Sequence, residues 1–392
     1  MNLFIQIITG VFFGILFGFV PSLHINVIGY FIILLGIFSF QLDFLFFLSF
    51  SISQLITSII PAIIFGVPTD QTINNLFPGQ RMFLLGKAKQ AIILSFIGYF
   101  LGVFFAILLL PLLYLLFTLF ASFYILIILV ILFVLFLFIF EQKTHFSKLI
   151  VITMILFSGA LGIITLKYNY FFKEPIFVCI FGLFGAPTLI VSLFSTKKVV
   201  QETTVDISIK KPFLSSFFGA ISSLFVIIIP SLSTAQSGLI ISKIRKKLTS
   251  EEYLILFSSV SISTLIFSYF LSIFFNKSRL GFISLLLSNK IIVPSINLFL
   301  FIITIIFTMV FTILILFLLL DGFLKIVNSL NQFLINTFIL IFSVFLILLI
   351  SGPTAIILLF ASVAIGFLPL VFNKPRVILM SYIMFPTLFY FI

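Results

Sequence analysis

Residues 91–140 read AIILSFIGYFLGVFFAILLLPLLYLLFTLFASFYILIILVILFVLFLFIF, fifty positions without one charged side chain. A helix needs about 20 apolar residues to cross the hydrocarbon core of a bilayer, so this stretch is long enough for two crossings. Its apolar residues are continuous, whereas the strands of a membrane β-barrel alternate in polarity. The stretch therefore predicts transmembrane helices.

The rest of the chain has the same character. Its 392 residues are 63% hydrophobic and 8% charged, with a mean hydropathy of +1.45. Soluble domains carry roughly a quarter of charged residues. We therefore predict an all-α, polytopic protein of the lipid bilayer, a multi-pass protein of a prokaryotic cell (plasma) membrane.

The positive net charge does not indicate nucleic-acid binding here, and the single cysteine does not allow an intrachain disulfide. A net charge of +12 can indicate nucleic-acid binding in a soluble protein. Here the basic residues lie mainly in short loops between apolar segments, where they orient a membrane protein, so no nucleic-acid partner is expected. Cys179 is the only cysteine, which excludes an intrachain disulfide.

Several short motifs occur twice in the same order. PSL stands at 21–23 and at 230–232, and each copy follows a glycine, Gly10 or Gly219, by eleven residues. Further matches are ISQLITSII (52–60) with ISTLIFSYF (262–270), and PTL at 187–189 with PTL at 386–388. The order predicts two homologous membrane repeats, 1–195 and 212–392, joined by a solvated polar linker, 196–211.

Each repeat contains about seven apolar segments, so we expect about 10–14 transmembrane or re-entrant helices. The second segment of each repeat is too short for an ordinary crossing. The predicted segments are 3–20, 27–40, 44–65, 91–118, 120–140, 149–166, 176–194, 213–229, 235–243, 253–275, 295–320, 334–350, 354–371 and 377–392.

An odd number of crossings makes the second repeat inverted relative to the first. If the linker is cytoplasmic, sixteen basic residues lie in inside loops and five in outside loops, in agreement with the positive-inside rule. The inside set is Arg81, Lys87, Lys89, Lys143, Lys148, Lys197, Lys198, Lys210, Lys211, Lys243, Arg245, Lys246, Lys247, Lys325, Lys374 and Arg376. Inverted repeats with interrupted helices are typical of secondary transporters.

The two PSL stretches, PSLHIN (21–26) and PSLSTAQS (230–237), interrupt apolar segments with proline and polar residues. If a half-helix begins after each proline, its free N–H groups and positive dipole end attract an anion. Side-chain donors would add to this substrate site: Ser22, His24, Asn26, Ser231, Ser233, Thr234 and Gln236. The alternative is two ordinary loops at the membrane surface.

The third segment of each repeat is rich in hydroxyl groups. Together with a polar insert (65–91), these segments provide candidates for ion coupling or for lining a path: Ser53, Gln54, Asp70, Ser263 and Thr264. An immersed acidic residue is costly and tends to be functional, whereas at the surface Asp70 is a turn residue. The hydroxyls can equally be packing residues that form interhelical hydrogen bonds.

Catalytic and metal chemistry find little support in the sequence. His24 and His145 are the only histidines and lie far apart in sequence, so no metal site is expected. There is no His-Glu-x-x-His motif and no glycine-framed nucleophile. We expect no enzyme and no cofactor, with Na⁺ or H⁺ as the coupling ion and proton coupling through His24 left open.

Several of these stretches resemble the large permease subunit of tripartite tricarboxylate transporters, the TctA-like family, and especially its archaeal single-chain branch. The resemblance rests on the spaced Gly10, Gly14 and Gly18 before PSLHIN, and on VPTDQTINNLFPGQRMFLLGKAKQAI (67–92). It continues through PSLSTAQSGLI, FGLFGAPTLIVSL (181–193) and GFLPLVFNKPRVILMSYIMFPTLFY (366–390).

The resemblance implies a permease for carboxylate-type organic anions, coupled to an ion gradient as a symporter. It also implies two partners, a small membrane subunit and an extracytoplasmic binding protein. The family usually has Pro-Gly at both breaks, whereas this chain has Pro21-Ser22 and Pro230-Ser231. A serine limits how closely the backbone approaches a ligand, which predicts an altered substrate or altered activity.

The sequence thus predicts a secondary transporter that binds a small organic anion at paired helix breaks near the membrane midplane and works by alternating access. The alternatives are a structural or assembly membrane protein without transport, and an intramembrane enzyme acting on lipid or peptide. Substrate, direction and oligomeric state stay open, a homo-oligomer included.

Overall fold

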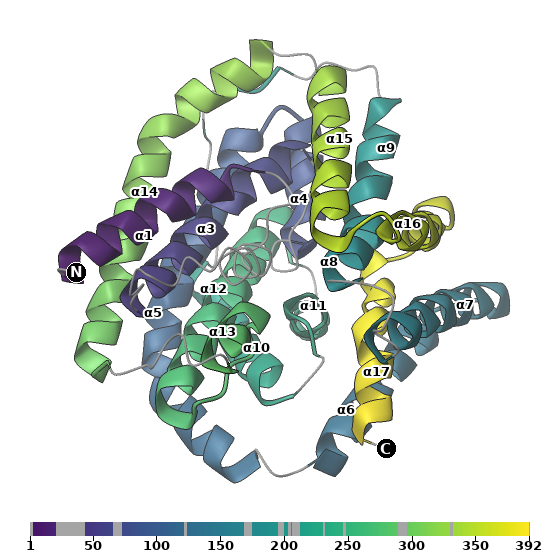
Figure 1. The fold of residues 1–392 in the computed structure, drawn as a ribbon, viewed down its shortest axis with the longest axis horizontal. Coiled ribbons are helices and arrows are strands. Elements are labelled where there is room, and N and C mark those ends of the chain that lie inside the picture. The colour runs from purple at the N-terminus through teal and green to yellow at the C-terminus, as the bar shows by residue number, and fades with distance from the viewer. Residues whose placement is uncertain are drawn as a thin grey trace. The chain divides into compact units, whose positions relative to one another are not determined.

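The computed structural model describes residues 3–20, 44–65, 73–120, 124–167, 175–194, 200–202, 205, 212–229, 232–245, 248–288, 296–329 and 332–391. These residues form α-helices, two short π-helices and one 3-10 helix, and they contain no strand (Figure 1). Six of the described helices are long and apolar enough to cross a membrane. The predicted all-helical, polytopic membrane fold is confirmed.

The chain divides into two compact units. Unit 1 consists of residues 1–115, 198–227 and 238–331, and unit 2 of residues 116–197, 228–237 and 332–392. Each unit therefore takes residues from both of the predicted repeats. The repeat boundaries themselves, and the inverted relation between the repeats, stay predictions.

Unit 1 contains the first segments of each predicted repeat. Its helices are α1 (Leu3–Gly18), α3 (Phe44–Phe65), α4 (Ile73–Leu84), α5 (Ala88–Phe120, to Leu115), α10 (Pro212–Ile228), α11 (Thr234–Ile244, from Gly238), α12 (Ser250–Phe275), α13 (Gly281–Ser288) and α14 (Leu298–Ser329). The long members agree with the predicted segments to within a few residues, except that α14 continues nine residues beyond its predicted end.

Two helices of unit 1 were not predicted. Helix α4 lies in the polar insert, and α13 lies in what was expected to be an outside loop. Helix α4 contains Pro78, and its residues Met82 and Phe83 are buried. Both helices are too short to cross a membrane, so hydropathy alone does not reveal them.

The closest packing in unit 1 is between α1 and α3. Gly10, Gly14 and Gly18 face α3 at intervals of four residues, one helical turn apart. A Cβ atom at Gly14 would lie 2.6 Å from the backbone oxygen of Phe50 and 2.6 Å from the Cβ of Ser53. Glycine is required at these positions because it lets the two backbones approach closely. Helices α1 and α3 run parallel, and both contact α14 (Figure 1).

Hydroxyl groups connect α3 to α14. The Thr308 hydroxyl donates to Ser49 Oγ over 3.1 Å, and Ser53 Oγ and Thr312 Oγ1 are 2.8 Å apart. Both pairs are separated by 259 residues, so the two helices run parallel and in register. All four side chains are fully buried.

An equivalent pattern connects α5 to α12. Gly98 of α5 lies against Ile255 and Ser258 of α12, and Gly102 lies against Ser259 and Ile262, one turn further along. The Ser263 hydroxyl donates to the carbonyl of Gly102 over 3.2 Å. From Gly98 to Gly102 the contacts move four residues along α5 and four residues along α12 in the same direction, so these two helices also run parallel.

The two parallel pairs run in opposite directions. The first turns of α5 and α12 meet where Gln90 Nε2 donates to Glu251 Oε1 (2.8 Å), and Lys89 Nζ lies 2.6 Å from Asp321 Oδ1 near the end of α14. At the other end, the Tyr269 hydroxyl of α12 donates to the carbonyl of Phe47 at the start of α3 (2.8 Å). Helices α5 and α12 therefore begin where α3 and α14 end.

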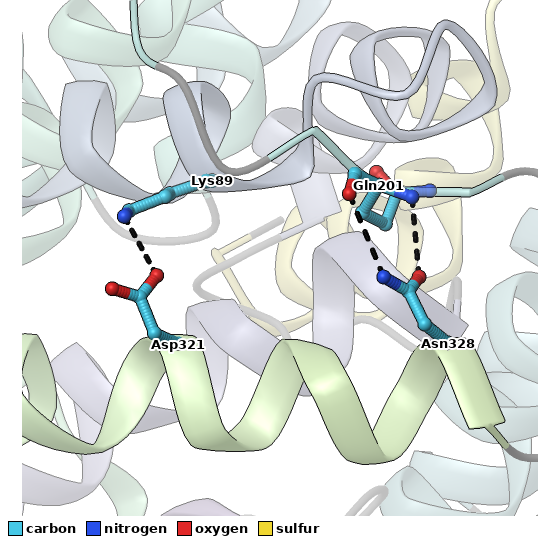
Figure 2. Close-up of polar contacts among 4 residues, drawn as sticks. All are labelled: Lys89, Gln201, Asp321 and Asn328. Atoms are coloured by element: carbon cyan, nitrogen blue, oxygen red, sulfur yellow. Dashed lines mark hydrogen bonds and ion pairs between the residues drawn. The ribbon is translucent and has the colours of Figure 1, made fainter.

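Residues of the predicted linker attach to unit 1 through Gln201 (Figure 2). Its side chain accepts from Ala88 N–H (3.0 Å) and donates to the carbonyl of Phe83 (3.1 Å), on either side of the turn at Gly86 (φ +83°). Its backbone pairs with the amide of Asn328 on α14 (3.1 and 3.5 Å). Gln201 is buried, so the expectation of a solvated linker is wrong at this residue.

Unit 2 contains the last segments of each predicted repeat and the start of α11. Its elements are the end of α5, α6 (Tyr124–Phe140), α7 (His145–Gly162), η1 (Ile163–Lys167), α8 (Pro175–Ile180), η2 (Phe181–Gly185), α9 (Ala186–Leu193), α15 (Gln332–Ser351), α16 (Ala355–Val371), η3 (Arg376–Met380) and α17 (Ser381–Phe391). The segments η1 and η2 are π-helices, and η3 is a 3-10 helix.

Helix α17 packs against α7 and η1 in unit 2 (Figure 1). Gly162 touches the backbone of Tyr382, whose hydroxyl lies 3.0 Å from Thr165 Oγ1. Gly182 of η2 and Gly366 of α16 likewise bring two backbones together, with Ser362 beside Gly182. As in unit 1, glycines allow the approach and buried hydroxyls form hydrogen bonds across it.

The glycine contact between α1 and α3 gives a direct test with a matched control. Gly14→Ala should destabilise the protein by about 1–3 kcal/mol, because the new methyl group meets fixed backbone of the neighbouring helix. Gly322→Ala in α14 has open space and should be neutral or stabilising by about 0.5–1 kcal/mol. Thermal unfolding of the detergent-solubilised protein measures both, and equal melting temperatures would contradict the proposed packing.

Candidate functional site

The second PSL stretch leads into helix α11, which begins at Thr234. The Gln236 N–H donates to Ser233 Oγ over 3.2 Å, and Ser233 N–H donates to Gln236 Oε1 over 3.0 Å. This reciprocal pair is a capping box, in which Ser233 is the N-cap and Gln236 the third helical residue. The sequence Ser-x-x-Gln therefore explains why the helix starts at this position.

The capping box changes how the helix start can bind an anion. Two backbone N–H groups, those of Ser233 and Gln236, already bond to side-chain oxygens of the protein. The N–H groups of Thr234 and Ala235 occupy the rest of the first turn, where the helix dipole is positive. An anion would therefore meet these two groups first, and would reach the others by displacing a side-chain oxygen.

The helix start is largely buried, with Ser233 partly exposed. Gln236 is fully buried, Thr234 is 9% exposed, and Leu232 just before the box is 3% exposed. Gln236 Nε2 donates over 3.0 Å to Met384 Sδ on α17. A thioether is a weak acceptor, so this amide group is held less firmly than an amide bonded to oxygen.

The structure brings together one part of the predicted substrate site. Ser233, Thr234 and Gln236 share the first turn of α11 and belong to unit 2 with Met384. Four other predicted residues, Ser22, His24, Asn26 and Ser231, lie outside the described residues. The pairing of the two breaks therefore stays a prediction.

The predicted ion-coupling residues lie in unit 1. Ser53, Gln54, Ser263 and Thr264 are buried on α3 and α12, while Asp70 lies outside the described residues. The Thr264 hydroxyl donates to the carbonyl of Val260 on its own helix (2.8 Å). Ser53 and Ser263 form the interhelical bonds described above, so their hydroxyls have packing partners in this structure, and a role in ion coupling stays a prediction.

One buried charge was missed by the sequence reasoning. Arg376 was counted among the inside-loop cations, but its side chain is only 4% exposed and the residue begins the 3-10 helix η3. Its Nη1 donates to Thr188 Oγ1 (2.8 Å) and to the carbonyl of Phe184 (3.3 Å) in unit 2. Hydropathy does not separate Arg376 from Lys374, two residues earlier, which is partly exposed.

The described residues contain no group of three or more His, Cys, Asp or Glu side chains that could hold a metal ion. The chemistry available at the start of α11 is that of hydroxyl, amide and backbone N–H donors. Such a set suits a carboxylate or another small anion.

The capping box can be tested by removing one of its two side chains. Gln236→Leu should lower the stability of the protein by about 0.5–2 kcal/mol, because Ser233 N–H loses its acceptor. Gln236→Glu retains an acceptor at the same place and should stay closer to the wild type. Thermal unfolding in detergent separates the two variants, and a stable Gln236→Leu protein would show that the box does not hold this helix start.

Comparison with known proteins gives two matches. The family model described as "Tripartite tricarboxylate transporter TctA family" matches residues 4–381. An uncharacterized protein of Methanocaldococcus jannaschii is 28% identical, over 99% of this chain and 98% of that protein. No solved structure matches the chain.

Proposed function

Since the chain belongs to the tripartite tricarboxylate transporter TctA family, we propose that it is a secondary transporter for small carboxylate anions. The family is one of transporter components, and the six apolar helices agree with a membrane protein. The choice of a carboxylate substrate, of ion coupling and of the binding residues is our proposal.

The buried start of α11 is the observation that carries this proposal. A largely buried helix start has limited access to water for its first N–H groups, so polar groups of the protein take that place. Gln236 Oε1 is this partner for the Ser233 N–H, and Ser233 Oγ is this partner for the Gln236 N–H. We propose that a substrate carboxylate replaces this oxygen and also bonds the N–H groups of Thr234 and Ala235.

Gln236 then acts as a displaceable cap. Its amide oxygen occupies the position where a carboxylate oxygen would accept from Ser233 N–H, and its amide nitrogen rests on Met384 Sδ. Displacing the Gln236 side chain breaks its hydrogen bond with the Ser233 N–H and its weak contact with Met384 Sδ. A carboxylate gains charge-assisted hydrogen bonds at the positive end of the helix.

The helix directions in unit 1 support alternating access through inverted repeats. Helix α5 packs in parallel on α12, and its predicted counterpart α14 packs in parallel on α3, the predicted counterpart of α12. The two pairs run in opposite directions. This exchange of partners with reversal of direction is what two inverted repeats would produce.

Polar contacts also support the proposed orientation. Lys89 and Asp321 form an ion pair in unit 1. The predicted topology places both residues on the inner side of the membrane. Lys374 Nζ donates to Gln142 Oε1 over 2.7 Å, which joins two inside loops of unit 2. We propose that both contacts lie on the cytoplasmic face of the prokaryotic cell membrane.

The proposed partners follow from the family. They are a small membrane subunit and an extracytoplasmic binding protein, which would deliver the anion to the outer face. A second copy of this chain is a further candidate partner. Co-purification of the tagged chain from its source organism would identify which of these are present.

The proposal is tested by transport in liposomes. The purified full-length chain should take up radiolabelled citrate, tricarballylate or succinate under an imposed Na⁺ or H⁺ gradient, above the level of empty liposomes. Gln236→Ala should alter the KM for the transported anion, because the proposed cap is removed. Absence of uptake of all three anions under both gradients would contradict the proposal and favour the structural alternative.

Ion coupling has its own test in Ser53 and Ser263. If their hydroxyls bind Na⁺, Ser53→Ala and Ser263→Ala should raise the Na⁺ concentration for half-maximal uptake by about tenfold, the loss of about 1.4 kcal/mol of binding. Thr304→Val is the comparison, since the buried Thr304 hydroxyl of α14 bonds its own helix over 2.8 Å and is not a candidate for ion coupling. Unchanged Na⁺ dependence in both serine variants would leave these hydroxyls with packing alone.

A further inference from the structure

Helix α4 of unit 1 ends in a turn that is fixed by hydrogen bonds. The Gly86 N–H donates to the carbonyl of Phe83 over 2.9 Å, and the Lys87 N–H donates to the carbonyl of Met82 over 2.8 Å. With Gly86 at a φ of +83°, these two bonds form a Schellman motif, a common glycine-dependent end of a helix. The Glu202 N–H donates to the carbonyl of Gly86 over 2.8 Å, so the linker is attached to the turn.

This fixed turn exposes three apolar side chains. Leu84 is 62% exposed, Leu85 is 64% exposed, and Val200 of the attached linker is 71% exposed. The carbonyl of Val200 lies 3.1 Å from the place that a Cβ atom on Gly86 would occupy, so the three residues are close in space. Contiguous exposed apolar side chains mark a site of contact with a partner or with a membrane.

Basic side chains stand on both sides of the two leucines in the chain. Arg81 lies one helical turn before Leu84 and Leu85, on the same face of α4, and Lys87 follows the turn. Both basic side chains are exposed, and neither forms an ion pair with a residue that the structure describes. Glu202 is an exposed acidic residue beside the same turn. The surface therefore combines apolar and cationic groups.

The turn lies beside the ends of two candidate membrane spans. Helix α5 begins at Ala88, and its Lys89 pairs over 2.6 Å with Asp321 near the end of α14 (Figure 2). Charged groups avoid the hydrocarbon core, so this ion pair marks the level at which both helices leave it. The turn before Ala88 is at the same level, in the layer of the lipid headgroups. In the orientation proposed above, this layer belongs to the inner leaflet.

We propose that this patch, formed by Arg81, Leu84, Leu85, Lys87 and Val200, binds an anionic phospholipid of the leaflet that it faces. The apolar side chains enter the boundary between headgroups and acyl chains, where burial of apolar surface stabilises them. The two cations contact the phosphate and the anionic headgroup. The naming of the inner leaflet rests on the proposed orientation, whereas the lipid site itself does not depend on transport.

A single introduced tryptophan tests the contact with lipid, because the chain contains no tryptophan of its own. The purified full-length Leu85→Trp protein is placed in nanodiscs of phosphatidylcholine that contain phosphatidylglycerol with brominated acyl chains. Bromine should quench its fluorescence strongly. Lys143→Trp, at an exposed position between α6 and α7, is the control and should be quenched weakly. Equal quenching at the two positions would overturn the proposal.

The preference for an anionic headgroup is the second readout. At equal mole fraction, brominated phosphatidylglycerol should quench Leu85→Trp more than brominated phosphatidylcholine does. Adding Arg81→Gln or Lys87→Gln should each lower the ratio of the two association constants by about fivefold. Glu202→Gln should raise this ratio, because a negative charge beside the patch is removed. Lys143→Gln removes a cation outside the patch and should leave the ratio unchanged.

Three outcomes would contradict the lipid site. Quenching by both lipids without a preference, or a preference that survives removal of both cations, overturns the role of Arg81 and Lys87. A patch that instead serves a protein partner gives weak quenching in nanodiscs of the purified chain, and this also overturns the proposal. If Leu85→Trp does not fold, Leu84→Trp and Val200→Trp replace it, since both side chains are exposed.

These measurements are separate from the test of the proposed function. Uptake of a carboxylate by a chain whose patch has no lipid preference would overturn the lipid site alone. A clear preference for phosphatidylglycerol in a chain that transports none of the tested anions would support the lipid site while the proposed function fails.

Discussion

Polar groups inside this protein must find partners in the protein, because hydrocarbon offers none. In unit 1 the requirement is met by placing helices so close that a hydroxyl on one reaches an oxygen on the next. Gly219 shows the arrangement, since a Cβ atom there would lie 2.6 Å from the carbonyl of Leu256. Beside it, Ser259 Oγ donates to the carbonyl of Ser216 over 2.7 Å. The glycines therefore allow the helices to approach closely, and the hydroxyls form hydrogen bonds across the short distance between them.

The same requirement explains the two polar sites of unit 2. A helix that starts in an apolar interior must be capped, and Ser233 and Gln236 cap α11 with neutral groups. A buried cation must be solvated, and Thr188 and the carbonyl of Phe184 contribute oxygens to Arg376. In both places the hydrogen-bond partners come from within unit 2 itself.

Much of the fold follows from the sequence, because membrane helices are encoded locally. Residues 44–65 were predicted as one segment and form α3 with these bounds. The glycines of α1 were recognised as a motif, and their four-residue spacing is the spacing of the contact with α3. Short helices such as α4 were missed because hydropathy registers only segments that can cross the membrane.

The parts that could not be predicted depend on partners distant in the chain. Gln201 is buried because Asn328, 127 residues away, meets its backbone. Arg376 is buried because Thr188, 188 residues away, accepts its hydrogen bond. The capping box is the opposite case: Ser233 and Gln236 are three residues apart, and the Ser-x-x-Gln pattern could have been read as a helix start.

The second PSL stretch lies where the chain passes from unit 1 into unit 2 and back. The chain enters unit 2 after Ile227 and leaves it after Ser237, so this segment of ten residues is the shortest part of unit 2 and lies between two portions of unit 1 along the chain. The same boundary falls inside α11, next to Gly238, and a second boundary falls inside α5, four residues after Pro111. Proline and glycine are the residues at which helices bend most readily, and each of these two helices carries one of them beside the boundary.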